Sequence, residues 1–212
     1  MSLSGKIIVI EGSDGSGKST LCTSLAQAIR DRGDFPEVLE IREPGGCELG
    51  EHIRGILKGS TIPGALTDPR AEALLFAAAR AELTATVIRP ALERGALVIC
   101  DRGIGSSLIY QGLARGLSVD MIREISLFAT DDLKVDRVVA LQVSAEAAQE
   151  RMTARDGEGR DRIEEALSAQ TLRDGYARLK DLSPHEVVEV SAEGSPDEVL
   201  GLTLEAIEDL LA

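Results

Sequence analysis

Short apolar runs alternate with longer segments of helical periodicity, and this alternation limits the possible folds of the chain more than any other feature. The apolar runs, each expected to form a strand, are residues 6–10, 38–41, 96–100, 137–143 and 186–190. The expected helices are residues 18–32, 48–57, 69–94 with a kink or junction at Pro90, 106–115, 119–128, 145–152, 163–179 and 196–211. Strands joined by helical crossovers form a parallel sheet that is covered on both faces. We therefore expect an α/β fold, a five-stranded parallel sheet flanked by helices, with ligands beyond the carboxyl ends of the strands.

Composition excludes several classes of protein. The 212 residues carry a formal net charge of −13, which argues against binding duplex nucleic acid through phosphate neutralisation. No apolar run approaches the roughly 18 residues of a membrane span, and residues 1–6 lack the pattern of a signal peptide. Cys22, Cys47 and Cys100 form no CxxC pair, which favours neither a disulfide framework nor a zinc site and fits the cytoplasm. The length predicts one domain over residues 1–212.

A complete phosphate-loop motif, GxxxxGK[ST], stands between the first predicted strand and the first predicted helix. Its glycines let the backbone curl so that N–H groups point at phosphate oxygens, and the helix that follows adds its positive end. Lys18 would reach the β- and γ-phosphates, and the Ser19 hydroxyl would coordinate Mg²⁺. A glycine-rich turn without function is the alternative, against which the full motif argues. The expected nucleotide-binding residues are Gly12, Ser13, Asp14, Gly15, Ser16, Gly17, Lys18, Ser19 and Thr20.

Asp101 ends the third predicted strand, where a carboxylate that assists Mg²⁺ stands in nucleotide-binding proteins of this kind. A helix N-cap is the other interpretation of an Asp after a strand. Asp101 by itself favours neither interpretation over the other. Beside a phosphate loop, the metal role is favoured.

Phe76 and Arg80 stand four residues apart, which places them on one face of a predicted helix. A ring with a guanidinium beside it suits a flat heterocycle, because the ring stacks and the Arg donates to a base oxygen. The alternative is a core Phe with an Arg that extends to solvent, and the spacing alone favours this alternative somewhat.

The segment from about residue 150 to 163 is hinged by glycines and rich in arginine. One interpretation is a lid that closes over the moving phosphoryl group, with arginines that stabilise the developing charge. The other is a solvated surface loop, because the acidic residues among the arginines nearly neutralise it. Taken by itself, the segment favours the second interpretation.

Taken in order, these motifs resemble those of the thymidylate kinase family, which belongs to the P-loop nucleoside monophosphate kinases and transfers the ATP γ-phosphoryl to dTMP. The resemblance covers nearly the whole chain. It is carried by residues 11–20 at the phosphate loop, the Arg-Glu-Pro-Gly-Gly signature at 42–46, the Phe76–Arg80 helix, residues 101–112, and residues 160–164 at the close of the lid. The resemblance implies the fold of these kinases with a short lid, ATP as the donor with Mg²⁺, dTMP as the acceptor, and a homodimer.

The resemblance also implies roles for single residues. Asp14 would contact the sugar 3′-hydroxyl and help to order the donor, while Arg102 and Arg54 would hold the dTMP phosphate. Phe76 would stack on thymine, and Arg80 would donate to a ring carbonyl. Ser106, Ser107 and Gln111 would line the base or sugar pocket, and Tyr110 would lie under the deoxyribose. The expected substrate-binding residues are Asp14, Glu43, Pro44, Arg54, Phe76, Arg80, Arg102, Ser106, Ser107, Tyr110 and Gln111.

Position 15 is Gly, whereas some members of the family carry an Arg there. The resemblance therefore implies that the catalytic cations come from the lid. The expected catalytic residues are Lys18, Asp14, Arg102, Arg151, Arg155 and Arg160, and the expected metal ligands are Ser19 and Asp101.

Gly103, Leu108 and Ile109 depart from the family pattern, beside the expected base and sugar pocket. They motivate an alternative function, a kinase for another deoxypyrimidine monophosphate. A nucleotide-binding regulator without phosphotransfer is a second alternative, against which the Arg-rich lid and the Phe76–Arg80 face argue together.

Overall fold

The computed structural model describes residues 3–59, 61, 67–154 and 167–211. These residues contain one five-stranded parallel sheet in the order β2-β3-β1-β4-β5. The strands are β1 (Lys6–Gly12), β2 (Val38–Arg42), β3 (Leu97–Asp101), β4 (Arg137–Gln142) and β5 (Val187–Ser191). The expected α/β fold is confirmed, and each strand lies within two residues of its predicted bounds.

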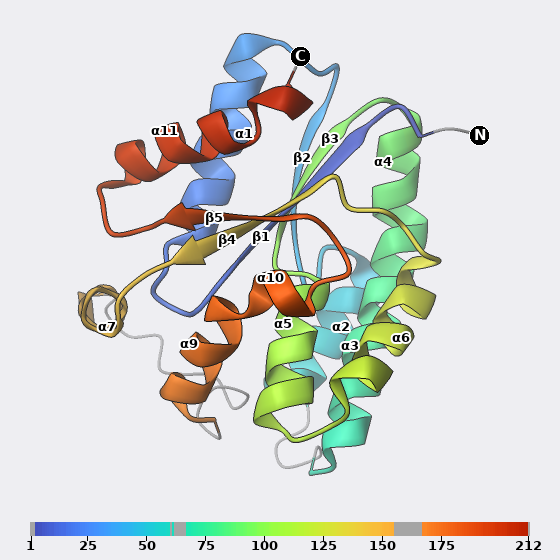
Figure 1. Ribbon diagram of the computed structural model, residues 1–212. Coiled ribbons are helices and arrows are strands. Elements are labelled where there is room, and N and C mark those ends of the chain that lie inside the picture. Colours follow the sequence, from blue (N-terminus) through green and yellow to red (C-terminus); the bar gives the residue numbers. More distant parts are fainter. Residues whose placement is uncertain (1–2, 60, 62–66, 155–166, 212) are drawn as a thin grey trace.

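Helices cover both faces of the sheet (Figure 1). One face packs against α1 (Lys18–Arg32) and α11 (Pro196–Ala206), which a 3-10 turn at Glu208–Leu210 follows. The helices on the side of the opposite face, or beyond the ends of the strands, are α2 (Glu48–Leu57), α3 (Pro69–Leu83), α4 (Arg89–Glu93), α5 (Ile104–Ser107), α6 (Val119–Thr130), α7 (Ala145–Ala154), α9 (Ala169–Ala177) and α10 (Leu179–Leu182). None of the described helices has the length and hydropathy of a membrane-spanning segment.

The central strands are apolar on both faces because both faces are covered. Ile8 and Ile10 of β1 are fully buried on the side of α1, and Ile7 and Val9 point into the core on the other side. The core consists chiefly of Ile, Leu, Val and Ala, because the chain has only five Phe and Tyr residues and one of them, Phe128, is exposed.

The expected helix over residues 69–94 is interrupted. A π-helical segment, Thr84–Ile88, separates α3 from α4, and Pro90 lies in the first turn of α4. Proline has no N–H to donate and its ring crowds the carbonyl four residues earlier, so regular α-helical bonding is interrupted there. The expected helix over 106–115 is α5 followed by a second π-helical segment, Leu108–Ala114. The start of the expected helix over 163–179 lies outside the described residues.

Parallel pairing brings the chemically active segments to one edge of the sheet. Ile10 of β1 lies opposite Asp101 of β3, and Asp101 lies opposite Arg42 of β2. The chain therefore leaves all three strands at the same level. The phosphate loop, the segment after Arg42 and the segment after Asp101 consequently meet beyond this edge.

Candidate active site

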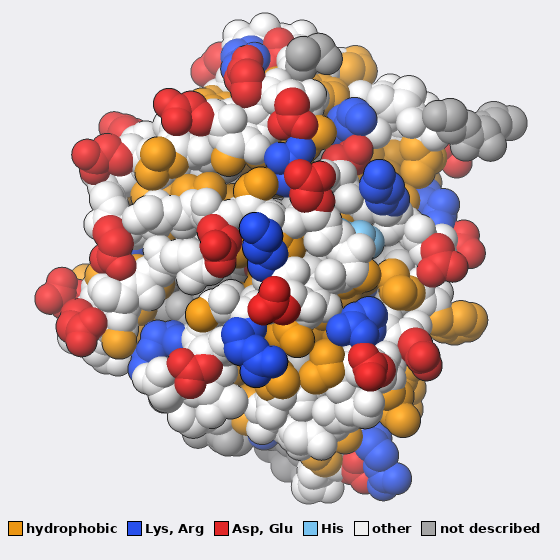
Figure 2. Space-filling view, in the orientation of Figure 1, with side chains coloured by type: hydrophobic (Ala, Val, Ile, Leu, Met, Phe, Trp, Pro, Cys, Tyr) orange, Lys and Arg blue, Asp and Glu red, His pale blue; other side chains and the backbone are white. Residues whose placement is uncertain are grey.

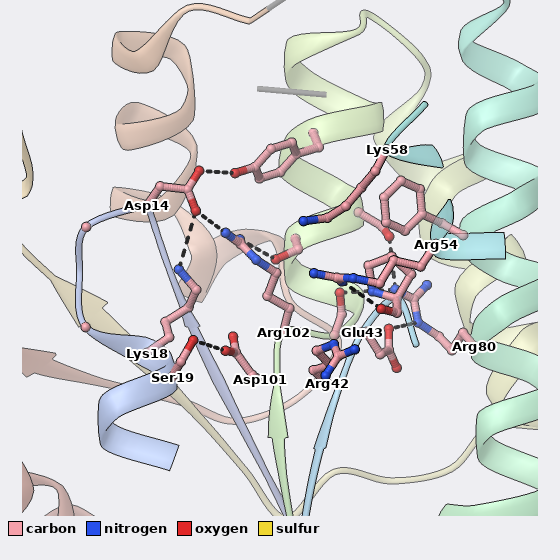
Figure 3. A pocket seen from close by; sticks show the side chains of 18 of the residues that line it. Asp14, Lys18, Ser19, Arg42, Glu43, Arg54, Lys58, Arg80, Asp101 and Arg102 are labelled. Atoms are coloured by element: carbon pink, nitrogen blue, oxygen red, sulfur yellow. Dashed lines mark hydrogen bonds and ion pairs between the residues drawn. The ribbon is translucent and has the colours of Figure 1, made fainter. Parts of the chain in front are cut away.

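A cavity of about 440 Å³ lies at this edge of the sheet, and Figure 3 shows the side chains around it. It brings together most of the residues that the sequence singles out. These are Asp14, Gly15, Gly17, Lys18, Ser19, Thr20, Glu43, Pro44, Arg54, Phe76, Arg80, Asp101, Arg102, Ser106, Ser107, Tyr110, Gln111 and Arg151. Gly12, Ser13 and Ser16 belong to the phosphate loop but do not line the cavity. Arg155 and Arg160 lie outside the described residues.

Lys18 is the buried cation of the phosphate loop. Its ammonium group donates to the Ser13 carbonyl at 2.9 Å and lies 3.8 Å from Asp14 Oδ1. Burial, reinforced by the charge of Arg102, lowers the pKa of Lys18 from 10.5 to about 8. Burial disfavours the charged form of Lys18 in the ligand-free loop, and the negative charge of an incoming phosphate would stabilise it.

Gly15 is required by the loop. Its φ of 78° is in the left-handed region, and a Cβ at this position would overlap the backbone carbonyl of Ala148 in α7. A side chain at position 15 therefore does not fit while α7 stands where it does. This gives a physical reason for the absence of an arginine from the loop.

Ser19 and Asp101 form a pair of oxygen donors at the cavity. The Ser19 hydroxyl donates to Asp101 Oδ2 at 2.7 Å. Hydroxyl and carboxylate oxygens are hard donors, which suit Mg²⁺, and Mg²⁺ normally completes its shell with water and substrate phosphates. Among the described residues no cluster of three or more His, Cys, Asp or Glu could hold a metal. The pair thus fits a magnesium ion that the nucleotide itself helps to hold.

Arg102 follows Asp101 and is held by several partners at once. Its backbone has a φ of 74°, which is unusual for a residue other than glycine. The guanidinium forms an ion pair with Asp14, donates to the Tyr176 hydroxyl at 2.8 Å, and lies 5.5 Å from the centre of the Tyr110 ring. The Tyr110 hydroxyl in turn donates to Asp14 Oδ2 at 3.3 Å. Arg102 thereby links the phosphate loop to the opposite half of the cavity.

Arg80 and Glu43 form a buried ion pair, with Nε of Arg80 2.7 Å from Glu43 Oε2. Arg80 is only 2% exposed and also donates to Ser126, to Ser107 and to the Gly103 carbonyl. Protein acceptors among the described residues thus take four of its five N–H groups, which leaves one to reach a base carbonyl. Burial raises the pKa of Glu43, and the charge of Arg80 opposes this rise.

The other expected substrate residues are also positioned by protein contacts. Arg54 of α2 donates to the carbonyl of Pro44 at 2.8 Å, and the peptide bond before Pro44 is cis. Gln111 is buried and donates to Glu72 at 2.9 Å. Arg151 lies in α7, within the helix expected over residues 145–152, and donates to the Gly194 carbonyl at 3.3 Å.

The sequence reasoning missed four residues of the site. Arg42 and Lys58 line the cavity, and Figure 3 shows the ammonium end of Lys58 directed into it. Glu11 is fully buried and accepts from the backbone N–H groups of residues 103 and 106. The sequence could have indicated Glu11, because it is a charged residue at the end of an apolar strand, next to a phosphate loop. Tyr176 carries no such signal in the sequence.

Two of the three departures from the family pattern lie behind the wall of the cavity. Leu108 and Ile109 are fully buried and do not line the cavity. Ile109 packs against Gly175, where an added Cβ would lie 2.6 Å from its Cγ2. Of the three departures only Gly103 lines the cavity, so Leu108 and Ile109 fill the core behind the site and do not shape its surface.

Comparison with known proteins gives a consistent result. Residues 10–201 match the family model described as thymidylate kinase. The chain is 40% identical over 211 residues to a thymidylate kinase of Rhizorhabdus wittichii, with 98% of this chain and 99% of the relative covered. It is 43% identical over 206 residues to a thymidylate kinase of Symbiobacterium thermophilum, with 96% and 93% covered. The resemblance is thereby confirmed, and neither alternative function is favoured. The chain belongs to the thymidylate kinase family.

Proposed function

We propose that this chain catalyses the reaction of ATP with dTMP to give ADP and dTDP, with the donor on the phosphate loop and the acceptor in the adjoining half of the cavity. The observation that carries the proposal is that one cavity joins Lys18 of the loop to the Phe76–Arg80 face through Arg102. Family membership supports the same reaction.

Catalysis would rest on positioning and electrostatics, since phosphoryl transfer leaves little covalent chemistry to the protein. An oxygen of the dTMP phosphate attacks the γ-phosphorus, and the bond from that phosphorus to the β–γ bridging oxygen breaks, with its electron pair leaving on ADP. Lys18 would neutralise the donor phosphates, and Arg102 with Arg54 would hold the dTMP phosphate in line. When bound, Mg²⁺ would neutralise charge on the donor phosphates, held on the protein side by Ser19 and Asp101.

The thymine base would lie against Phe76 and within hydrogen-bonding reach of Arg80. Phe76 is half-buried on α3 and would stack on the ring, while the remaining N–H of Arg80 would donate to a ring carbonyl. Tyr110 would lie under the deoxyribose, with its hydroxyl already next to Asp14, where the 3′-hydroxyl would arrive. Ser107 and Gln111 would support the base pocket through their bonds to Arg80 and Glu72.

Measuring ADP release with dTMP, dUMP, dCMP, dGMP and UMP offered separately tests the proposal. We expect a clear preference for dTMP, as family membership implies, and the remaining N–H of Arg80, which suits a ring carbonyl, should disfavour the amino group of cytosine. Replacing Arg80 by Ala should weaken the binding of dTMP more than that of ATP. A preference for another monophosphate would refute the thymine assignment, and an equal loss for both nucleotides would refute the base-reading role.

We also propose that the chain forms a homodimer through the outer surface of α3 and α6. Phe128 and Met121 of α6 are 87% and 57% exposed, and Leu74 of the adjacent α3 is 58% exposed. Figure 2 shows hydrophobic side chains along the edge of the molecule where α6 lies. Apolar side chains this exposed on two adjacent helices are typical of an interface. Sedimentation should give a dimer, and Phe128→Ser should shift it toward monomer; a monomeric wild-type protein would refute the proposal.

The proposal includes a lid over residues 150–163, which the position of Arg151 at the cavity supports. Its other catalytic cations would be Arg155 and Arg160. The lid would belong to a single domain of residues 1–212. The three cysteines are free, which supports a cytoplasmic location. Replacing Arg151, Arg155 and Arg160 singly by Met should lower kcat more than the affinity for dTMP.

A further inference from the structure

Tyr176 of α9 lies outside the motifs that carry the resemblance, yet its side chain reaches Arg102 in the site. The residue is 3% exposed. Its hydroxyl oxygen lies 2.8 Å from a terminal nitrogen of Arg102 and 2.9 Å from the Ser106 hydroxyl. Because the Tyr176 hydroxyl makes both hydrogen bonds inside the protein, its orientation is fixed.

The hydrogen bonds around Tyr176 have only one consistent direction. Arg102 can only donate, so the Tyr176 oxygen accepts from it, and because Ser106 gives its one proton to Glu11, the Tyr176 hydroxyl is the donor of its bond to Ser106. The Ser106 hydroxyl then donates to the buried carboxylate of Glu11 at 2.6 Å. Burial raises the pKa of Tyr176, which keeps the hydroxyl protonated and able to donate at neutral pH. A directed chain therefore runs from Arg102 through Tyr176 and Ser106 to Glu11.

This series of hydrogen bonds holds one side of the Arg102 guanidinium, while Asp14 holds the other. The ion pair with Asp14 occupies the second terminal nitrogen of Arg102. Without the Tyr176 hydroxyl, the first terminal nitrogen would keep only longer contacts, at 3.3 Å to Ser106 and 3.4 Å to the Gly12 carbonyl. The guanidinium could then turn further toward Asp14 and away from an acceptor phosphate.

We propose that Tyr176 is a positioning residue that holds the Arg102 guanidinium in the orientation that binds the phosphate of the acceptor nucleotide. The inference rests on the role proposed above for Arg102. It adds a residue that touches no substrate and acts through the arginine. It predicts a defect in phosphate recognition and none in base recognition.

The test compares the binding of dTMP with that of thymidine, which lacks the phosphate, by calorimetric titration of the full-length protein. Hydrogen bonds to charged groups are among the stronger ones, so Tyr176→Phe should raise the Kd for dTMP about tenfold. It should leave the Kd for thymidine within about twofold of the wild type, since the contacts of Arg80 are untouched.

Leu172→Val is the matched control, because Leu172 is a buried side chain of the same helix, one turn before Tyr176, and makes no hydrogen bond through its side chain. It should leave the ratio of the two affinities unchanged. Arg102→Met is measured in parallel and should weaken dTMP alone. If it does so while Tyr176→Phe changes neither ligand, or both equally, the positioning inference is overturned and the site stands. If Arg102→Met shows no preference between the ligands, the role of Arg102 fails, and the inference fails with it.

Discussion

Replacing Lys18 by Met should stabilise the ligand-free fold and abolish turnover at the same time. Lys18 is buried, and its pKa falls from 10.5 to about 8 on folding. A shift of this size means that folding disfavours the charged form by about 3 kcal/mol near neutral pH, with the nearby acids already included. The lost hydrogen bond to Ser13 offsets about 1 kcal/mol of this. We expect the variant to gain about 2 kcal/mol in free energy of unfolding.

The pH dependence isolates this effect from general changes in packing. The folded pKa lies below the unfolded one, so the unfolded state binds more protons between about pH 8 and pH 10.5. The wild type gains stability as the pH rises through this window, whereas Lys18→Met has no such group to titrate. The advantage of the variant should therefore shrink by about 2 kcal/mol between about pH 7 and pH 9.5.

Urea unfolding of both proteins without nucleotide, at the two pH values and one protein concentration, measures this difference. Other groups titrate in both proteins and cancel in the comparison. A stability difference that is the same at both pH values would refute the reasoning, because the cost would then not belong to the Lys18 charge. ADP release measured alongside should fall to background, and a near-normal rate would remove Lys18 from the mechanism.

Three further changes test other parts of the site. Arg80→Met leaves Glu43 buried without its partner and should destabilise the fold by about 3–5 kcal/mol. Because the charge of Arg80 opposes the rise that burial causes in the pKa of Glu43, this pKa rises further in the variant. The loss should therefore grow as the pH rises; denaturation at low and neutral pH checks the sign, and an equal loss would contradict it. Gly15→Ala should weaken ATP binding and lower the stability of the fold more than Gly17→Ala. Both glycines have a positive φ, but only a Cβ at position 15 would overlap the backbone of α7. Equal effects of the two substitutions in ATP titration and unfolding would refute the overlap. Asp101→Asn should raise the Mg²⁺ concentration for half-maximal ADP release about tenfold, and an unchanged Mg²⁺ dependence would exclude Asp101 from the metal site.

The elements of this fold could be predicted because their causes are local in sequence. Each strand is a contiguous apolar run, and the motif of Gly12 to Ser19 carries its own turn, so the strand bounds and the phosphate loop needed no distant information. The meeting of the loop with Asp101 also followed from the sequence, since parallel strands joined by crossovers end at one edge. The interruption before Pro90 followed from the covalent structure of proline alone.

Only the tertiary structure decided how the charged side chains pair and which of them face the cavity. Arg80 pairs with a glutamate 37 residues away, and Arg102 bonds a tyrosine 74 residues away. Leu108 and Ile109 stand next to pocket residues in the sequence, but both side chains turn into the core, where Gly175 of α9 leaves space for Ile109. Periodicity and motifs report the local preferences of the backbone. The partner of a buried charge and the direction of a side chain depend on which distant elements pack against it, and so they exist only once the chain has folded.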